Sequence, residues 1–206
     1  MIEKGARVLF QGDSITDCGR DREKDTLGGG YPYFAAALFQ SMYPELEATF
    51  INRGISGNRT ADLVKRWDED CLALKPDVLS ILIGINDTWR GYDSNDPTSA
   101  DDYYANYKEI LTRTRDALGD ISILILEPFV MPYPADRLAW RTDLDPKIQK
   151  ARQLAREFNA VYIPLDGIFA QNSVAVPPSF WAADGVHPTA AGHALIAKCW
   201  LDAVEY

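Results

Sequence analysis

The chain has 206 residues, 47% of them hydrophobic, and this length suits one sizeable core better than two. We therefore expect a single domain over residues 1–206. The net charge of −9 argues against nucleic acid or an anionic membrane as the main partner, because either would be repelled over most of the surface.

Nothing in the sequence has the features of a targeting or membrane segment. The start, Met1 to Arg7, runs into a strand-like stretch without the roughly 7 to 15 apolar residues of a signal peptide, and no later run reaches about 18 uncharged apolar residues. The three cysteines are widely spaced and form no Cys-x-x-Cys motif, which favours free thiols in a reducing compartment. We therefore expect a cytoplasmic protein.

Short apolar runs that predict buried parallel strands alternate along the chain with segments of helical periodicity. Joined by right-handed crossovers, they predict an α/β fold: a three-layer α/β/α sandwich around a five-stranded parallel sheet, with the flavodoxin-like strand order 2-1-3-4-5. The predicted strands are Val8–Phe10, Ala48–Ile51, Val78–Ile83, Ile121–Leu126 and Ala160–Leu165.

Five segments predict helices, and several have recognisable start signals. The predicted helices are Tyr33–Tyr43, a helix capped by Thr60 that runs to about Leu74, Asp101–Leu118, a helix opened by Asp145 and Pro146 that carries Phe158, and a last helix from Ala190 to about Val204 after Thr189.

Four connections exceed the usual short length, and the first three follow strands 1, 3 and 4 at the carboxyl edge of the sheet, where open α/β sheets bind ligands. They are 17–30, 88–100, 129–143 and 171–183. Flat rings in them could cover a sugar face, although loop aromatics are also often lids over a core edge or oligomer contacts. These aromatic residues are Trp89, Tyr92, Tyr133, Trp140 and Trp181.

The first strand stops at Gly12-Asp13-Ser14, where a glycine would let the chain turn sharply and expose the next side chains. Ser14 is a candidate nucleophile. Taken alone, the segment is equally consistent with a plain turn in which Ser14 or Thr16 caps a short helix.

Two later segments could stabilise a developing oxyanion. Asn52 to Asn58 follows strand 2, and its glycines permit a backbone that presents N–H groups to a ligand. Asn86 follows strand 3, and its amide donates hydrogen bonds without changing charge with pH. Each signal is weak alone, because glycine-rich loops are common and Asn86 with Asp87 could form an Asx turn or cap.

Asp184-Gly-Val-His187 precedes the final helix, and its spacing can place a carboxylate beside an imidazole in a tight turn. The other histidine, His193, lies within the last predicted helix, where we expect packing or a surface position. We interpret Cys18 as an ordinary loop thiol, because no second histidine is placed to activate it. With two histidines and scattered carboxylates, we expect no metal site and no cofactor.

Together, Gly12-Asp13-Ser14-Ile15, Gly54 to Gly57, Gly84-Ile85-Asn86-Asp87 and Asp184-x-x-His187 resemble the SGNH (GDSL-type) hydrolase superfamily, in the expected order over almost the whole chain. The resemblance implies a flavodoxin-like fold and a serine esterase mechanism. It implies Ser14 as nucleophile, His187 as base and acid, Asp184 as orienting carboxylate, and an oxyanion hole of the Ser14 and Gly57 amides with the Asn86 side chain.

The residues that flank these motifs are most similar to those of intracellular bacterial acetyl-xylooligosaccharide and other carbohydrate acetylesterases of the superfamily. We therefore expect an acylated sugar as substrate, contacted by Asp13, Arg59 and Trp89, with Arg20 and Arg90 as further donors to hydroxyls. A lysophospholipase or thioesterase stays an alternative, as does a non-catalytic binding module on the same fold. Exposed loop aromatics such as Trp140 and Trp181, with the acyl-sugar relatives, lead us to expect a homo-oligomer.

Overall fold

The structure, a computed structural model, describes residues 1–204 and contains one five-stranded sheet in the order β2-β1-β3-β4-β5. All four pairings between neighbouring strands of this sheet are parallel. The predicted fold class and strand order are confirmed. The strands are β1 (Arg7–Gly12), β2 (Thr49–Asn52), β3 (Val78–Leu82), β4 (Ser122–Leu126) and β5 (Val161–Ile163).

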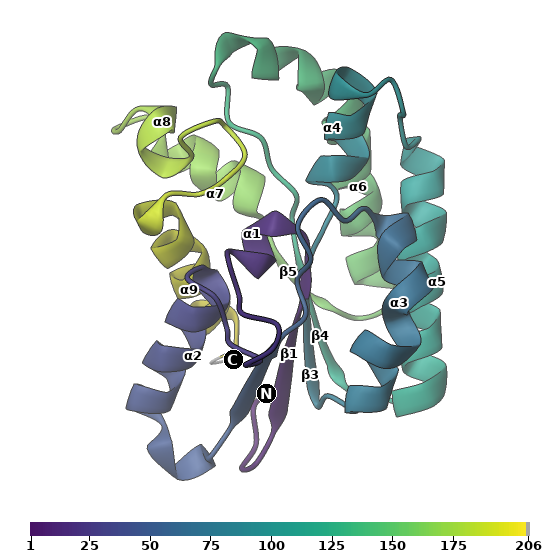
Figure 1. Cartoon of the computed structure of the whole chain (residues 1–206), viewed down its shortest axis with the longest axis vertical. Coiled ribbons are helices and arrows are strands. Elements are labelled where there is room, and N and C mark those ends of the chain that lie inside the picture. Colours follow the sequence, from purple (N-terminus) through teal and green to yellow (C-terminus); the bar gives the residue numbers. More distant parts are fainter. Residues whose placement is uncertain (205–206) are drawn as a thin grey trace.

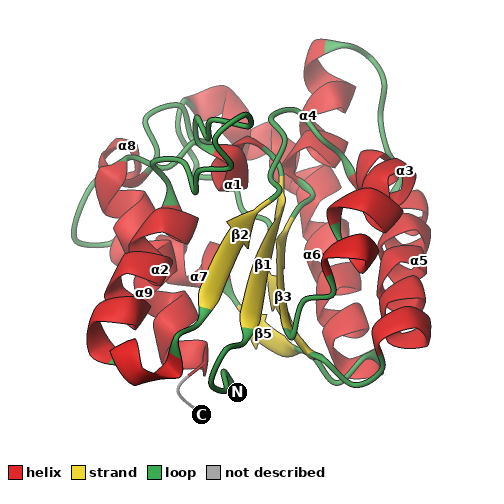
Figure 2. Ribbon diagram, turned by 60° about the horizontal axis from the view of Figure 1, so that its bottom comes forward, coloured by secondary structure: helices red, strands yellow, loops and turns green. Residues whose placement is uncertain are grey.

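Helices cover both faces of the sheet, giving three layers (Figures 1 and 2). One layer holds α2 (Tyr31–Met42), α7 (Leu165–Asn172) and α9 (Ala190–Val204), and the other holds α3 (Thr60–Asp70), α5 (Ala100–Leu118) and α6 (Arg141–Glu157). The remaining elements are the short helices α1 (Ser14–Asp17), α4 (Ile85–Asp93) and α8 (Pro178–Trp181) and the 3₁₀ helices η1 (Pro44–Leu46), η2 (Leu72–Leu74) and η3 (Ala135–Trp140).

Both faces of the central strand β3 are buried. Val78 and Leu82 pack in the cluster beneath α2 and α9, whereas Leu79 and Ile81 pack in the cluster beneath α3 and α5. Each such side chain stabilises the fold by roughly 1.5–3 kcal/mol when fully buried. Because neither face meets water, four of the five residues of the strand are apolar, and the hydroxyl of the fifth, Ser80, accepts from the buried Trp200 indole at 3.1 Å. Such a run indicates a buried strand in the sequence.

Some helix boundaries differ from the predictions. Arg59, not Thr60, is the cap residue of α3, because the Asp62 carboxylate accepts from the Arg59 amide and Thr60 is already helical. The helix α6 begins at Arg141 rather than Asp145, so Pro146 lies inside it. A proline there removes one backbone donor, and the buried face that follows it still holds the helix against the sheet.

Two helices, α4 and α7, were not predicted, because each starts within three residues of the end of the preceding strand. The loop predicted over 88–100 begins inside α4, which starts at Ile85 after Gly84, a residue with φ of +133°. The strand predicted to reach Leu165 ends at Ile163, and α7 starts two residues later. Among residues 1–204, no helix has the length and apolar character needed to cross a bilayer.

Candidate active site

Ser14 lies at the carboxyl end of β1 as the first residue of α1. A Cβ on Gly12 would come within 2.3 Å of both the Leu82 carbonyl oxygen and the Thr16 hydroxyl, so only glycine fits where the strand turns. The Asp13 carboxylate caps the helix by accepting from the Ile15 amide at 3.0 Å. Strand and cap together fix the direction of the Ser14 side chain.

The turn at Asp184 brings three side chains into one hydrogen-bonded row. The Asp184 Oδ2 lies 2.7 Å from His187 Nδ1, and His187 Nε2 lies 2.9 Å from Ser14 Oγ. Because an ionised carboxylate only accepts hydrogen bonds, Nδ1 carries the proton and the lone pair of Nε2 faces the hydroxyl. This is the geometry in which an imidazole can take a proton from serine.

The Asp184 carboxylate is stabilised in its ionised form. Partial burial opposes ionisation, but hydrogen bonds from the His187 ring and from the His187 and Val186 amides outweigh it and lower the pKa of Asp184. The side chains of His187 and Asp184 remain 45% and 40% exposed. The row is therefore open to a substrate from solvent.

The loop after β4 braces this turn. Gly185 has φ of +85°, and a Cβ on it would lie 1.8 Å from the Tyr133 carbonyl oxygen, so the turn requires glycine on both grounds. The Met131 amide donates to the Gly185 carbonyl at 2.8 Å. The turn is thus held by a segment more than forty residues away in the sequence.

The loop after β2 packs on α1. The Ile55 amide donates to the Gly12 carbonyl at 3.1 Å, and the Asp17 carboxylate accepts from the Ser56 amide at 3.0 Å. Gly57 follows with φ of +83° and no atom within 4 Å of its Cβ position, so its backbone is open on that side. These contacts bring the Gly57 segment to the same edge as Ser14.

Asn86 lies in the first turn of α4 and is almost fully buried. Its Nδ2 donates to the Asn58 carbonyl at 3.2 Å, which ties it to the Gly57 loop. The next residue, Asp87, accepts from the Thr60 hydroxyl at 2.6 Å and from the Thr60 amide, and so anchors α4 to α3. Burial raises the pKa of Asp87 to about 6.

Asp13 does not occupy the position expected of a substrate contact. Its side chain is 1% exposed, and Oδ2 has no hydrogen-bond partner within residues 1–204. Burial raises the pKa of Asp13 to about 7. In the folded chain it caps α1 next to Ser14, and a side chain this deeply buried is not placed to contact substrate as expected.

Aromatic rings form a wall beside the imidazole. The Trp89 ring centroid lies 5.8 Å from that of His187 and 5.2 Å from that of Trp140, and Tyr92 stacks on Trp140 at 5.4 Å. Trp89 and Tyr92 project from α4, not from a loop as expected. Trp140 is 3% exposed, so it gives no support to the expected homo-oligomer.

Comparison with known proteins identifies the family. The model of the GDSL-like lipase/acylhydrolase family matches residues 10–195, which is most of the chain.

The chain belongs to the GDSL-like lipase/acylhydrolase family.

Similar proteins are known at full length. An acetylxylan esterase from Geobacillus stearothermophilus is 36% identical over 214 residues, covering 100% of this chain and 96% of the relative. A crystal structure of a putative GDSL-like lipase from Parabacteroides merdae superposes with a TM-score of 0.94 at 36% identity, covering 100% of this chain and 98% of that one.

A catalytic mutant of Axe2, described as an acetylxylan esterase from G. stearothermophilus, superposes with a TM-score of 0.91 at 35% identity, over 100% of this chain and 96% of that one. Family and relatives agree in the chemistry they indicate: the GDSL-like chain is a carboxylic ester hydrolase with an SGNH-type α/β fold.

The arginines expected to contact substrate in this GDSL-like hydrolase already have partners within the protein. Arg59 pairs with Asp96 at 2.9 Å, and Arg20 donates to the Gly54 carbonyl at 2.8 Å. The Arg90 guanidinium lies 5.8 Å from the Trp89 ring centroid and donates weakly to Asn86 Oδ1 at 3.5 Å. A substrate role for Arg59 stays a prediction.

A histidine does lie beside Cys18, which the sequence did not indicate. Cys18 Sγ lies 3.4 Å from His193 Nε2, although 175 residues separate them. The Tyr31 amide donates to His193 Nδ1 at 3.1 Å, so the ring proton must be on Nε2, facing the sulfur. Burial lowers the pKa of His193 to about 4 and raises that of the Cys18 thiol. His193 therefore cannot act as a base toward Cys18.

Two basic residues near the candidate site of this GDSL-like protein, Lys147 and Arg137, were not predicted from the sequence. Lys147 is fully buried on α6, where its Nζ contacts the Asp143 carboxylate and the Thr88 hydroxyl next to Asp87. A sequence signal existed, because Lys147 lies on the apolar face of α6 four residues after Asp143. Arg137, in η3, had no such signal.

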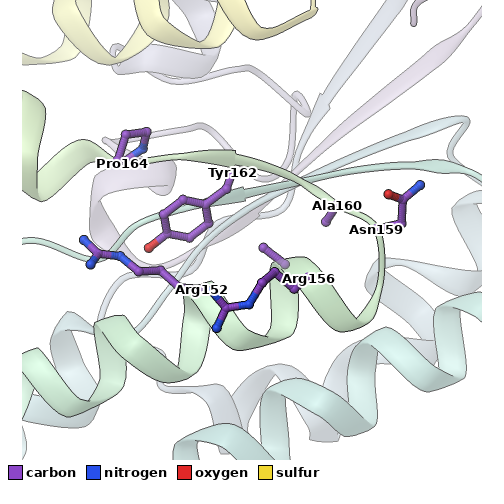
Figure 3. A pocket seen from close by; sticks show the side chains of 7 residues that line it. Arg152, Arg156, Asn159, Ala160, Tyr162 and Pro164 are labelled. Carbon is purple, nitrogen blue, oxygen red and sulfur yellow. The ribbon is translucent and has the colours of Figure 1, made fainter.

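A cavity of about 580 Å³ lies between β5 and the C-terminal half of α6, away from the three-residue row (Figure 3). None of Ser14, Asp184 and His187 lines it. Figure 3 shows Tyr162 pointing from β5 toward α6, from which Arg152 and Arg156 project. Arg152 pairs with the buried Glu127 carboxylate at 2.5 Å, so its charge already has a partner.

Proposed function

We propose that this chain is a serine esterase that removes acetyl groups from carbohydrate, with acetylated xylo-oligosaccharides as substrates. The observation that carries the proposal is the row from Asp184 through His187 to Ser14, with contacts of 2.7 and 2.9 Å. The similarity to an acetylxylan esterase over the whole chain supports the choice of substrate.

In the proposed reaction Ser14 Oγ attacks the ester carbonyl carbon while His187 Nε2 takes the hydroxyl proton. Asp184 stabilises the imidazolium that forms. His187 then gives the proton to the sugar oxygen as its bond to the carbonyl carbon breaks, which releases the sugar hydroxyl and leaves an acetyl-enzyme. Water repeats the sequence on the acetyl group and releases acetate.

The proposed oxyanion hole consists of the Ser14 amide, the Gly57 amide and Asn86 Nδ2. Support comes from the hydrogen bonds that hold the Gly57 loop on α1 and Asn86 against that loop. We expect Asn86→Ala to fold and to lose about 10²–10³ in turnover, the usual cost of removing one such donor. Steady-state kinetics with p-nitrophenyl acetate checks this, and an unchanged rate would remove Asn86 from the site.

The surroundings of the site support a sugar as the alcohol part of the ester. Trp89 presents an aromatic face beside His187, and such faces pack well against the apolar face of a sugar ring. Arg59 is the predicted donor to sugar hydroxyls, and its guanidinium pairs with Asp96 at 2.9 Å in the folded chain.

The test is hydrolysis of p-nitrophenyl acetate, butyrate and octanoate beside acetylated xylo-oligosaccharides, using wild type and Ser14→Ala. We expect preference for acetate, release of acetate from the oligosaccharides, and loss of both activities in Ser14→Ala. A preference for octanoate would keep the serine mechanism and replace the substrate by a lipid or thioester. Activity that survives in Ser14→Ala would reject the mechanism.

We also propose that the chain acts as one catalytic domain. Its cytoplasmic location and its self-association stay predictions. Light scattering of the purified protein decides the oligomeric state without bearing on the catalytic proposal.

A further inference from the structure

Arg137 lies in η3, within the connection from β4 to α6, and its side chain covers the Asp184 turn. Its side chain is 15% exposed, whereas those of its neighbours Asp136 and Leu138 lie in solvent. Arg137 Nε donates to the Asp184 carbonyl oxygen at 3.3 Å. One edge of the guanidinium therefore contacts the backbone of the residue that orients His187.

The face of the same guanidinium packs on the aromatic wall. Its central carbon lies 4.2 Å from the Trp140 ring centroid and 5.4 Å from the Trp89 ring centroid. Trp89 in turn lies against the His187 ring. One planar group thus contacts both the turn that carries the imidazole and the wall on which the imidazole rests, an arrangement that a lysine ammonium cannot reproduce.

This arrangement does not favour a role for the Arg137 charge in stabilising His187 during the reaction. A free cation this close would oppose the positive charge that His187 gains during the reaction. Arg137 Nη1 pairs with Asp136 at 2.6 Å, which offsets that charge. The part of the group that faces the active site contributes shape and a directed hydrogen bond.

We propose that Arg137 is a positioning residue that holds the Asp184–His187 turn and Trp89 in their reactive arrangement. The inference rests on the proposed serine esterase function. Small displacements of a reacting group reduce rates strongly, by about 10²-fold for 1 Å. Without Arg137 the turn keeps the Met131 bond to Gly185 but loses its second hydrogen bond to the segment after β4, so we expect His187 to sample unreactive positions.

The experiment compares wild type with Arg137→Ala, Arg137→Lys and Arg137→Gln. The matched control is Arg115→Ala, because Arg115 is also a largely buried arginine that donates to backbone carbonyls, but at the C-terminal end of α5. Three quantities are measured: kcat and KM for p-nitrophenyl acetate, the melting temperature, and the downfield proton NMR signal of the His187 Nδ1–H. We expect kcat to fall about tenfold or more in all three Arg137 variants, KM to change less than about twofold, and the NMR signal to broaden or vanish.

Addition of ethylguanidinium to Arg137→Ala should restore part of kcat, and Arg115→Ala should keep both kcat and the NMR signal. A purely structural role predicts a lower melting temperature with kcat and the NMR signal unchanged below that temperature, and this result would overturn the proposal. If Arg137→Ala does not fold, Arg137→Lys and Arg137→Gln decide by the same criteria.

The NMR signal also separates this inference from the esterase proposal. It can be recorded in a Ser14→Ala background, where no turnover is required. Loss of the signal on replacing Arg137 there would support positioning even if the substrate or the nucleophile were different. Persistence of the signal in that background, for every Arg137 variant, would reject positioning while leaving the esterase proposal intact.

Discussion

Two pairs of a nucleophilic side chain and an imidazole lie at the two ends of α1. Ser14 begins the helix and contacts His187 Nε2 at 2.9 Å, and Cys18 caps its end and contacts His193 Nε2 at 3.4 Å. The nearer ring nitrogen is the same in both pairs. What differs is the partner of the other nitrogen, which is the Asp184 carboxylate for His187 and the Tyr31 amide for His193.

This difference reverses the direction in which a proton can move. A carboxylate keeps the proton on Nδ1 and leaves Nε2 free to accept, whereas a backbone N–H requires Nδ1 to accept and puts the proton on Nε2. Burial reinforces the contrast, because it lowers the pKa of His193 to about 4 while His187 remains half-exposed. A nucleophile beside a histidine is thus not by itself a catalytic pair.

The largest expected effect comes from giving His187 the bonding pattern of His193. In Asp184→Asn, the amide oxygen can still accept from the Val186 and His187 backbone amides. Its NH₂ group must then donate to Nδ1, which moves the ring proton to Nε2, facing Ser14. We expect kcat to fall by about 10⁴, the usual cost of the wrong tautomer.

The measurement is steady-state hydrolysis of p-nitrophenyl acetate with circular dichroism to verify folding. Asp202→Asn is the matched control, because Asp202 is also an aspartate paired with a basic side chain, Lys198, but on the exposed face of α9. A loss of less than about tenfold in Asp184→Asn would show that the partner of Nδ1 does not separate the two pairs.

The next effect is on stability and concerns the second pair. In His193→Phe the buried Tyr31 amide loses its acceptor, and an unsatisfied buried donor costs about 1–3 kcal/mol. We expect the free energy of unfolding to fall by about that amount at pH 8, with kcat unchanged within about threefold. Urea unfolding and steady-state kinetics check the two statements, and a large loss of kcat would assign His193 to the catalytic machinery.

The same variant has a pH signature. The pKa of His193 is about 4 in the folded chain and about 6.5 when unfolded, so between these values the unfolded chain binds more protons. The contribution of His193 to stability is therefore complete above pH 6.5 and declines as the pH falls toward 4. The stability difference between wild type and His193→Phe should shrink over this window.

Much of the fold and of the candidate site could be predicted because the signals are local. The buried strand β3 is apolar at four of its five positions, and Ser14, Asn86 and His187 each follow a strand or precede a helix in a short motif. Parallel strands collect such motifs at one edge, so their proximity follows once the strand order is known. The row that joins Asp184 to Ser14 is the result.

The missed features depend on distant contacts instead. Cys18 and His193 are 175 residues apart, Lys147 and Thr88 are 59 apart, and Arg137 and Asp184 are 47 apart. No periodicity or motif records such contacts, because each depends on how two loops or helices are seated on the sheet. The burial of Asp13 next to Ser14 was not predicted for the same reason, since it is set by packing from several elements.

A smaller effect is expected at Asp13, the buried carboxyl group next to Ser14. Its pKa of about 7 lies above the ordinary 3.8, so between these values the folded chain binds more protons than the unfolded chain. Stability from this group is present below pH 3.8 and is lost as the pH rises toward 7, the reverse of the His193 case.

Asp13→Asn should remove that loss while keeping an oxygen for the Ile15 amide. We expect the variant to be more stable than wild type by about 1–2 kcal/mol at pH 8. This gain is smaller than the stability lost through ionisation of Asp13, because the new NH₂ group is buried where Oδ2 has no partner. Urea unfolding at pH 5 and pH 8 checks this. An equal stability difference at both pH values would exclude titration of Asp13 as its cause.

The smallest expected effect is at Cys18, and it completes the comparison between the two pairs. Burial raises the pKa of the thiol, and His193 donates a proton toward the sulfur instead of accepting one, so little thiolate forms near neutral pH. We expect Cys18→Ser to change kcat less than about threefold, and iodoacetamide to alkylate Cys18 more slowly than a free thiol of ordinary pKa.

Mass spectrometry of a time course measures the rate of Cys18 alkylation, with unfolded protein as the reference. Fast alkylation of folded protein, or a large loss of kcat in Cys18→Ser, would mean that His193 does accept the thiol proton, and the tautomer that separates the two pairs would have to be reassigned.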